Sequence, residues 1–282
     1  MAAFVAYLKL FRLPFVFTAV ADSAAGYLIA RRGPPDVRVL GLLALASAAL
    51  YAFGMAMNDV ADRQRDKTLA PGRPLPSGRI TLRGALTASL VILAAGAAAV
   101  RLLEGKPGPV QGMFVAAFVG VMLYDFLFKI PPVMGSIRFF NLLMGVAAGG
   151  VDGLKGAWIL GLPSLVYGTS LTFVSTLEDG QGRKGMRWLG LAGMAAAAVT
   201  PAILGRPLAW VPALALTAWL VKRAVAEPDK NGVMLMVRDG VAGFILLDAT
   251  LLASFGRTAE AAAVAALLLP AFGLVAIFRR LG

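Results

Sequence analysis

Long apolar runs, each close to the length that crosses a membrane, follow one another along the whole chain. About 20 apolar residues in a helix are enough to cross the hydrocarbon core of a bilayer. We identify ten such runs, at residues 14–30, 38–57, 81–101, 109–128, 134–151, 157–177, 187–204, 207–222, 239–256 and 259–279. With 59% hydrophobic residues and a mean hydropathy of +0.78, the chain has the composition of a polytopic membrane protein. We therefore predict an all-α fold, a polytopic transmembrane helical bundle that forms a single domain over residues 1–282.

The basic residues predict the orientation of this bundle. Lys and Arg number 19 on the side of the N-terminus and 8 on the other side, which accounts for all 27 in the chain. Cytoplasmic loops of membrane proteins carry the excess of Lys and Arg. We therefore expect a multi-pass protein of the cytoplasmic membrane, with both ends and the loop after the second run in the cytoplasm. Topology also explains the net charge of +12, so we expect no nucleic-acid partner.

A strongly polar passage, Asn58 to Gly78, interrupts the apolar pattern after the second run. Its first nine residues include Asn58, Asp59, Asp62 and Asp66, which in one helix would fall within an arc of about 100°. Carboxylates on one face repel one another unless a cation lies between them. The chain has no Cys and no His, so a metal site must use oxygen ligands, and hard oxygens suit Mg²⁺. The passage predicts a Mg²⁺ site, and the alternative is a solvated charged loop.

Basic residues accompany these acids. Arg63 lies among them, and Arg73 opens the turn RPLPSG, in which Pro74 and Pro76 restrict the backbone. Arginine binds phosphate oxygens with parallel hydrogen bonds. Acids for a metal beside arginines for phosphate predict a diphosphate-binding site. With phosphate as its partner, Arg73 would contribute to donor affinity and not to folding.

The spacing Asn58-Asp59-x-x-Asp62-x-x-x-Asp66, followed by Arg73-Pro-Leu-Pro-Ser-Gly, resembles the first aspartate-rich motif of the UbiA superfamily of intramembrane prenyltransferases. The resemblance implies a core of nine membrane helices, so the tenth run would be a C-terminal addition. It also implies Mg²⁺, an isoprenyl diphosphate donor and a prenyl acceptor whose identity the sequence does not give. A narrower similarity, in RLPFVFTAVAD and in LLDA near the end, is to the EboC-like branch.

Two further polar residues follow the fourth run, in the segment YDFLFKIPPVMG. Tyr124 and Lys129 resemble the family's Tyr and Lys pair, which implies that Lys129 neutralises phosphate oxygens. The alternative is a tyrosine of the membrane interface and a lysine that extends along the membrane surface.

Three apolar runs contain charged or amide side chains away from their ends. Asp22 lies in the first run, Arg138 and Asn141 in the fifth, and Asp248 in the ninth. Such groups are costly inside a membrane and usually face the bundle interior, a partner or a cavity. Arg138 and Asn141 could bind the diphosphate, or Arg138 could pair with Asp22 or Asp248.

The sixth run ends in a polar stripe. Thr172, Ser175, Thr176 and Asp179 follow helical spacing, and Glu178 lies about 100° around the helix from Asp179. The resemblance implies a second aspartate motif at this place.

This second motif is incomplete, because Gly182 and Arg183 stand where a further acid is expected. We expect Arg183 and Lys184 to contact phosphate directly, and the metal to be held mainly by Asp62, Asp66 and Asp179.

The sequence thus predicts an integral membrane prenyltransferase that ionises an isoprenyl diphosphate with Mg²⁺ and transfers the prenyl group to an acceptor. The alternative is a catalytically silent protein of this family that binds or transports a prenyl-lipid or a small molecule. The predicted catalytic residues are Asp62, Asp66, Asp179, Lys129 and Tyr124; the predicted diphosphate ligands are Arg63, Arg73, Lys129, Arg138, Asn141, Arg183 and Lys184; the predicted metal ligands are Asn58, Asp59, Asp62, Asp66, Glu178 and Asp179.

Overall fold

The computed structural model describes residues 2–104, 108–150, 156–179, 185–226 and 230–280. Over these ranges the chain forms helices and turns without strands, which confirms the predicted all-α class. The elements are α1 (Ala2–Leu10), η1 (Leu13–Phe15), α2 (Val16–Ala30), α3 (Val37–Ala61), α4 (Arg63–Leu69), α5 (Leu82–Glu104), α6 (Pro109–Phe126), α7 (Pro131–Ala148), η2 (Ala157–Gly161), α8 (Leu162–Ser175), η3 (Thr176–Asp179), α9 (Met186–Leu204), η4 (Pro207–Ala209), α10 (Trp210–Ala226), α11 (Lys230–Ser254), α12 (Thr258–Ala265) and α13 (Leu268–Arg280).

Local chemistry sets several of these helix starts. The side chain of Asp36 accepts hydrogen bonds from the backbone N–H groups of Arg38 (2.8 Å) and Val39 (3.4 Å), and so caps the first turn of α3. Pro109 and Pro131 are the first residues of α6 and α7, where a missing N–H is harmless and the fixed φ suits a helix.

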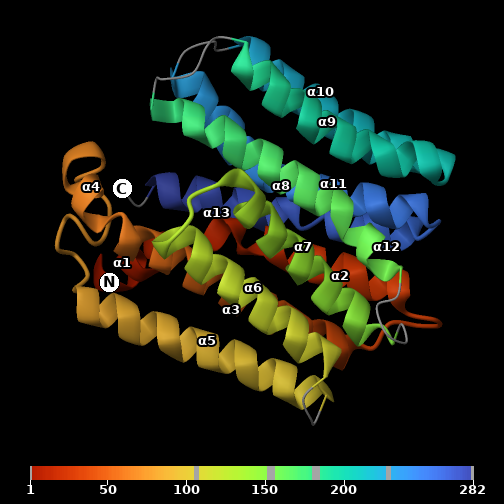
Figure 1. The fold of residues 1–282 in the computed structure, drawn as a ribbon, viewed down its shortest axis with the longest axis horizontal. Coiled ribbons are helices and arrows are strands. Elements are labelled where there is room, and N and C mark those ends of the chain that lie inside the picture. Colours follow the sequence, from red (N-terminus) through yellow and green to blue (C-terminus); the bar gives the residue numbers. More distant parts are fainter. Residues whose placement is uncertain (1, 105–107, 151–155, 180–184, 227–229, 281–282) are drawn as a thin grey trace.

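Eight helical segments of the described chain are long and apolar enough to cross a membrane, which is fewer than the ten runs of the sequence. The fifth and ninth runs do form helices, α7 and α11, but they contain internal polar residues such as Arg138, Asp239 and Asp248. Both helices lie among other helices: α7 packs against α2, α6 and α8, while α11 packs against α2, α8, α9, α10 and α12 (Figure 1). Because protein and not lipid surrounds much of their surface, they tolerate a lower hydropathy than helices at the edge.

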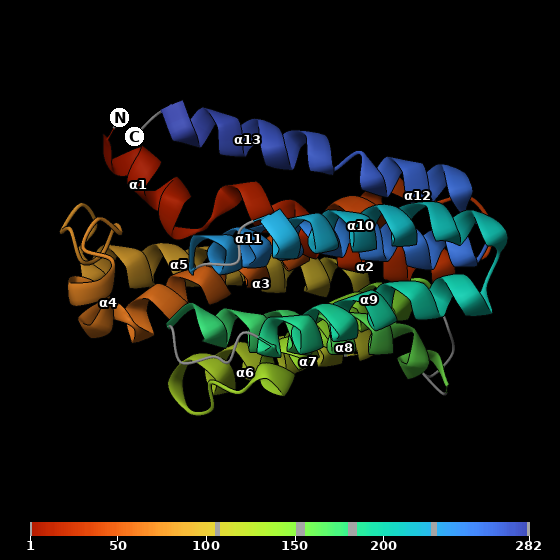
Figure 2. The ribbon, with the colours of Figure 1, turned by 90° about the horizontal axis from the view of Figure 1, so that it is seen from above.

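The tenth run is divided into two helices. It was expected as one helix over residues 259–279, but α12 ends at Ala265 and α13 begins at Leu268 (Figure 2). Pro270 explains the break, because proline has no N–H to bond the carbonyl of Ala266 and its ring collides with that carbonyl. The N–H of Leu269 bonds Ala266 instead, at 3.0 Å, in a tighter turn.

Both ends of the chain lie at the same end of the bundle, beyond α1 and α13, and α4 lies at this end as well (Figure 2). The two ends thus lie on one side of the bundle, which is where the sequence analysis expected them relative to one another.

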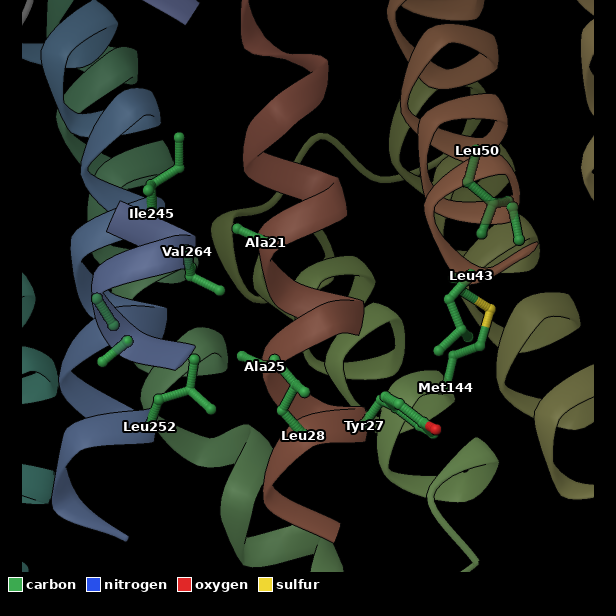
Figure 3. Close-up of a cluster of buried hydrophobic side chains, with 14 of the residues drawn as sticks. Ala21, Ala25, Tyr27, Leu28, Leu43, Leu50, Met144, Ile245, Leu252 and Val264 are labelled. Carbon is green, nitrogen blue, oxygen red and sulfur yellow. The ribbon is translucent and has the colours of Figure 1, made fainter. Parts of the chain in front are cut away.

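The largest hydrophobic core joins helices that are distant in the sequence (Figure 3). It brings Ala25 and Tyr27 of α2 together with Leu43 of α3, Met144 of α7 and Leu252 of α11, all of them buried. At the contact of α2 with α7, small residues bring the two backbones close together. A Cβ atom added at Gly145 would lie 1.9 Å from the carbonyl oxygen of Ser23. Helices α2, α3 and α7 therefore form a closely packed centre around which the site is built.

Candidate active site

The four oxygen-bearing residues of the first motif lie where α3 gives way to α4. Asn58 and Asp59 belong to the last turn of α3, Asp62 lies at the junction, and Asp66 lies in the short helix α4. The sequence analysis placed all four on one face of one helix. The structure divides this stretch into two helices at Asp62, although the N–H groups of Asp62 and Asp66 still bond the carbonyls of Asn58 and Asp62, at 2.9 Å each.

Basic side chains lie against these carboxylates. Arg73 Nη1 is 2.6 Å from Asp66 Oδ2 and 3.5 Å from Asp59 Oδ1, so one guanidinium joins both acids. Arg12 Nη2 lies 3.4 Å from Asp59 Oδ1. Asp59 and Asp66 are themselves buried, which strengthens these contacts relative to exposed ion pairs. The expectation that Arg73 has no protein partner is therefore wrong: it holds the turn RPLPSG against the motif.

The end of α6 contributes to the same place. Lys129, which follows α6, makes an ion pair with Asp62. Asn58 Nδ2 donates a hydrogen bond to Asp125 Oδ1 at 3.0 Å. The structure thus brings Lys129 to the first motif, and its contact with phosphate stays a prediction.

Sequence reasoning missed two residues of this cluster, Arg12 and Asp125. Asp125 had a visible signal, because it is an acid at the end of an apolar run, beside Tyr124. Arg12 had a weaker signal, because it opens the run RLPFVFTAVAD, but its contact with Asp59 joins positions 47 residues apart.

A cavity extends from this cluster into the bundle, between α2, α3, α6 and α7. Its volume is about 80 Å³, and it is partly open to the outside. Asn58, Tyr124 and Asp125 line one end, and Ser47, Arg138 and Asn141 line the other. The walls between them are largely apolar and are formed by Leu50, Gly54, Met55, Ala117, Val121, Met134 and Ile137. An amphiphile with an anionic head could place its head at the cluster and its apolar chain in the cavity.

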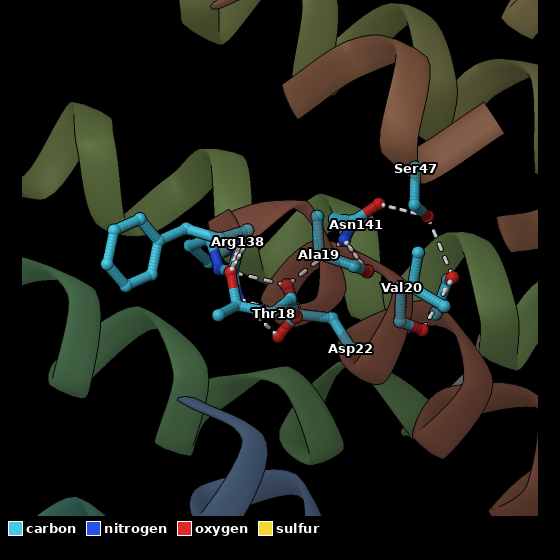
Figure 4. Close-up of polar contacts among 9 residues, drawn as sticks. Thr18, Ala19, Val20, Asp22, Ser47, Arg138 and Asn141 are labelled. Carbon is cyan, nitrogen blue, oxygen red and sulfur yellow. Dashed lines mark hydrogen bonds and ion pairs between the residues drawn. The ribbon is translucent and has the colours of Figure 1, made fainter. Parts of the chain in front are cut away.

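Arg138 and Asn141, predicted as diphosphate ligands, belong to a buried network deeper in the bundle (Figure 4). Arg138 contacts both oxygens of Asp22, with Nη2 3.0 Å from Oδ1 and Nε 2.9 Å from Oδ2. Its Nη2 also donates to the carbonyl oxygen of Thr18 at 2.8 Å, and its guanidinium lies over the ring of Phe244. The structure therefore favours the alternative in which Arg138 pairs with Asp22.

Asn141 completes the network. Its amide nitrogen donates to Asp22 Oδ2 at 3.0 Å and to the carbonyl oxygen of Ala19 at 2.8 Å, while its oxygen accepts from Ser47 Oγ at 2.8 Å. Asp22 is fully buried, so its charge is balanced by Arg138 and its oxygens are met by hydrogen bonds.

The second motif is described only in part. Glu178 and Asp179 end the short helix η3, but the structure describes their backbone only, and Arg183 and Lys184 lie outside the described residues. The hydroxyls of Ser175 and Thr176 donate to carbonyl oxygens of α8 itself, at 2.7 Å. The role of this stripe in binding stays a prediction.

The chemistry of the first motif fits Mg²⁺, because Asn58, Asp62 and Asp66 supply the hard oxygen atoms that this ion prefers. Among the described residues, however, no three acidic side chains are placed to share one ion. The carboxylates of Asp62 and Asp66 face Lys129 and Arg73 instead. A metal at this site would therefore have to take the place of these cations.

The fold and the site define a class of protein, an all-α membrane bundle in which acidic and basic side chains gather beside one end of a largely apolar cavity. Residues 19–226 match the sequence model of the UbiA prenyltransferase family, and the chain belongs to this family. The narrower resemblance to the EboC-like branch stays a prediction.

Two curated relatives and one solved structure illustrate the similarity. Digeranylgeranylglyceryl phosphate synthase of Thermococcus gammatolerans is 30% identical over 64% of this chain and 62% of its own length. Protoheme IX farnesyltransferase of Cytophaga hutchinsonii is 26% identical over 49% of this chain and 47% of its own. A UbiA homologue from Archaeoglobus fulgidus, solved bound to GPP and Mg²⁺, superposes with a TM-score of 0.62 at 16% identity, over 89% of this chain and 99% of that one.

The structural and the sequence comparisons cover different shares of the proteins compared. The structural superposition shows the fold, and almost the whole solved chain takes part in it. The matched segments, by contrast, span less than two thirds of the length of the two curated relatives. The family and the fold follow from the comparisons, and the activity is a separate question.

Proposed function

We propose that this integral membrane protein is a prenyltransferase that uses Mg²⁺ to ionise an isoprenyl diphosphate and transfers the prenyl group to an acceptor. One observation carries the proposal: Asn58 and Asp125, which lie next to the ion pairs of the first motif with Arg73 and Lys129, line one end of a largely apolar cavity. This arrangement places charge where a diphosphate would lie and apolar surface where its chain would lie.

In this proposal the basic residues change partners when the donor binds. Arg73 and Lys129 leave Asp66 and Asp62 for the diphosphate oxygens, which arginine and lysine both bind well. Asn58, Asp62 and Asp66 are then free to hold Mg²⁺, which when bound stabilises the negative charge of the departing diphosphate. Arg63, at the start of α4, is a further candidate for phosphate contact.

The cavity walls have the second role. They exclude water from the allylic cation that forms when the carbon–oxygen bond breaks, so that the acceptor and not water captures it. Tyr124 lines the cavity, as does its neighbour Asp125. We propose that its ring faces the allylic carbon, as an aromatic face attracts positive charge.

The second motif completes the site in this proposal. Asp179 and Glu178 add oxygen ligands from η3, and Arg183 and Lys184 add phosphate contacts in place of the absent third acid. The positive-inside rule places these loops, and the first motif, on the cytoplasmic side.

A silent binding protein is the second candidate, and a specific observation favours it: Asp59, Asp62 and Asp66 are each already paired with a base. A site that is neutral at rest can hold an anionic lipid without performing chemistry.

Purified protein in lipid nanodiscs separates the two candidates. Donor binding and donor consumption are measured with a series of isoprenyl diphosphates, with and without Mg²⁺, in the parent protein and in Asp62→Asn and Asp179→Asn. The enzyme requires Mg²⁺-dependent consumption that both substitutions reduce strongly, with each tenfold loss equal to about 1.4 kcal/mol of transition-state stabilisation. Glu178→Gln is the matched control and should have a smaller effect. Full activity in Asp179→Asn would refute the second motif, whereas binding without turnover for every donor would establish the silent protein.

A further inference from the structure

A second cavity lies at the end of the bundle opposite the first motif. It is bounded by the start of α8, the end of α9 and the end of α11, close to the turn that joins α9 to α10 (Figure 2). Its volume is about 580 Å³, against about 80 Å³ for the cavity beside the first motif. Sites for small molecules usually enclose about 300–1,000 Å³. This second cavity, the distal groove, therefore has the size of a ligand site.

The packing of α8 against α9 explains why this space is open. Near the start of α9, away from the groove, a Cβ atom added at Gly190 would lie 2.3 Å from the side chain of Val174 on α8. Glycine at such a contact lets two helices approach closely. Further along α9, small side chains and a proline inside the helix leave space unfilled, and the lining residues there are Ala196, Ala197, Thr200 and Pro201.

The lining of the distal groove suits a hydrocarbon chain and not a polar solute. Ala197 and Leu251 line it and are buried, whereas Phe255 at its edge is exposed. The hydroxyls of Thr200 and Ser254 already donate to carbonyl oxygens of their own helices, at 2.8 and 2.7 Å. An apolar space without partner atoms forfeits dispersion contacts, and lipid chains surround these membrane-spanning helices. A lipid chain is therefore the occupant that the lining favours.

A guanidinium without an acidic partner lies at the rim of the distal groove. Arg206 follows Gly205, a lining residue, and its N–H donates to the carbonyl oxygen of Ser254, another lining residue, at 3.0 Å. Its Nε lies beside the turn after α11, because a Cβ atom added at Gly256 would be 3.1 Å from it. Arg206 is exposed, and no acidic side chain of the described chain pairs with it. The rim thus offers a positive charge to an anion outside the protein.

We propose that the distal groove binds an anionic phospholipid of the leaflet opposite the first motif, with one acyl chain between α8, α9 and α11 and its phosphate against Arg206. The two parts of the site match the two parts of this one molecule, since arginine binds phosphate oxygens with parallel hydrogen bonds. A second copy of the chain fits less well. A two-fold contact would place the same surface opposite, and none of the described lining residues is acidic, so Arg206 would stay unbalanced.

Native mass spectrometry of the delipidated protein in detergent provides the first test. The protein is titrated with phosphatidylglycerol and with phosphatidylcholine that carry the same acyl chains. One phosphatidylglycerol should bind about fivefold more tightly than phosphatidylcholine, because it alone has a net negative charge to balance Arg206. Glycerophosphoglycerol, the head group without chains, should not bind in the same concentration range, because it buries no apolar surface. Equal affinity for the two lipids, or binding of the head group alone, would overturn the proposal.

Two substitutions test the two parts of the site separately. Arg206→Gln should weaken binding of phosphatidylglycerol at least about threefold and leave phosphatidylcholine within about twofold. Arg101→Gln is its control, because Arg101 is exposed at the end of α5 and does not line the groove. Ala196→Trp should weaken binding of both lipids at least about tenfold, because the indole takes the place of the acyl chain. Ala192→Trp is its control, because Ala192 is also exposed on α9 but does not line the groove.

The comparison of each variant with its control decides the outcome. Equal losses in a variant and its control would show that lipids coat the bundle without a defined site, and would overturn the proposal. A dimer that Ala196→Trp dissociates, with lipid binding unchanged, would make the groove an interface between copies and would also overturn it. Unfolding in SDS checks that each variant is folded, and Val166→Trp, on the α8 side of the groove, replaces Ala196→Trp if that variant does not fold. The proposal concerns the end of the bundle away from the first motif, so isoprenyl diphosphate binding should stay unchanged in Arg206→Gln.

Discussion

Replacement of Arg138 by methionine tests whether Asp22 is ionised in the buried network and paired with the Arg138 guanidinium, as their geometry indicates. Arg138 is 8% exposed and Asp22 is 0% exposed, and the guanidinium meets both carboxylate oxygens at 2.9 and 3.0 Å. Methionine keeps much of the volume and removes the cation. Asp22 would then be an unpaired charge inside the bundle, and it would have to take up a proton to stay buried.

The cost of this protonation sets the expected loss of stability. Protonating a carboxylate of ordinary pKa, about 3.9, costs about 4 kcal/mol at pH 7 and about 1.5 kcal/mol at pH 5. The figure at pH 7 agrees with the roughly 3–5 kcal/mol that breaking one side of a buried ion pair costs. Arg138→Met should therefore destabilise the protein strongly at pH 7 and less at pH 5, because the proton is easier to obtain as the pH falls.

The assay is reversible unfolding in mixed micelles by increasing SDS, at both pH values. Arg83→Met is the control, because Arg83 is exposed at the start of α5 and its loss should change stability by no more than about 0.5 kcal/mol. The double variant Arg138→Met with Asp22→Asn removes both charges and should recover a large part of the loss. A loss below about 1 kcal/mol in Arg138→Met, or one that does not depend on pH, would refute this account.

The remaining predictions concern single features of the structure. Both carboxylate oxygens of Asp248 are buried without a hydrogen-bond partner among the described residues, so the group should be neutral, and Asp248→Asn should cost less than about 1 kcal/mol in the same unfolding assay. A loss above about 3 kcal/mol would show that Asp248 is ionised. Lys129 is about 39% exposed in its pair with Asp62, so Lys129→Ala should leave stability within about 1 kcal/mol and yet weaken donor binding; unchanged binding would remove it from the site. Reporters fused to the two ends of the chain should both report the cytoplasm, and opposite sides would contradict an even number of crossings.

The sequence was sufficient for features that depend on periodicity and composition. Apolar runs of spanning length predict the helices, and the first motif predicts where acids and bases gather. The ion-pair and hydrogen-bond partners of the internal polar residues were harder to predict, because they depend on contacts between distant parts of the chain. Arg138 could be assigned to phosphate or to Asp22 from the sequence, and only the packing of α2 against α7 decides between them.

The interruptions of helices were also not predicted from the apolar pattern of the sequence. The interruption at Asp62 separates α3 from α4, although the spacing of the acids suits one continuous helix. The division of the last run at Ala266 had a signal in Pro270, but apolar length alone concealed it. Hydropathy counts measure affinity for lipid, and a helix interruption depends on backbone hydrogen bonds that hydropathy does not measure.

The central position of α7 and α11 has a consequence for how the protein is made. An arginine or aspartate at the middle of a helix costs about 2.5–3.5 kcal/mol when the helix enters the membrane alone. Helix α7 carries Arg138, and α11 carries Asp239 and Asp248, yet each packs against the helix that precedes it in the chain, α6 or α10. We expect these two helices to leave the translocon as hairpins with α6 and α10 and not one at a time. Glycosylation mapping of α7 expressed with and without α6 measures this directly, and efficient insertion of α7 alone would show that biogenesis needs no such pairing.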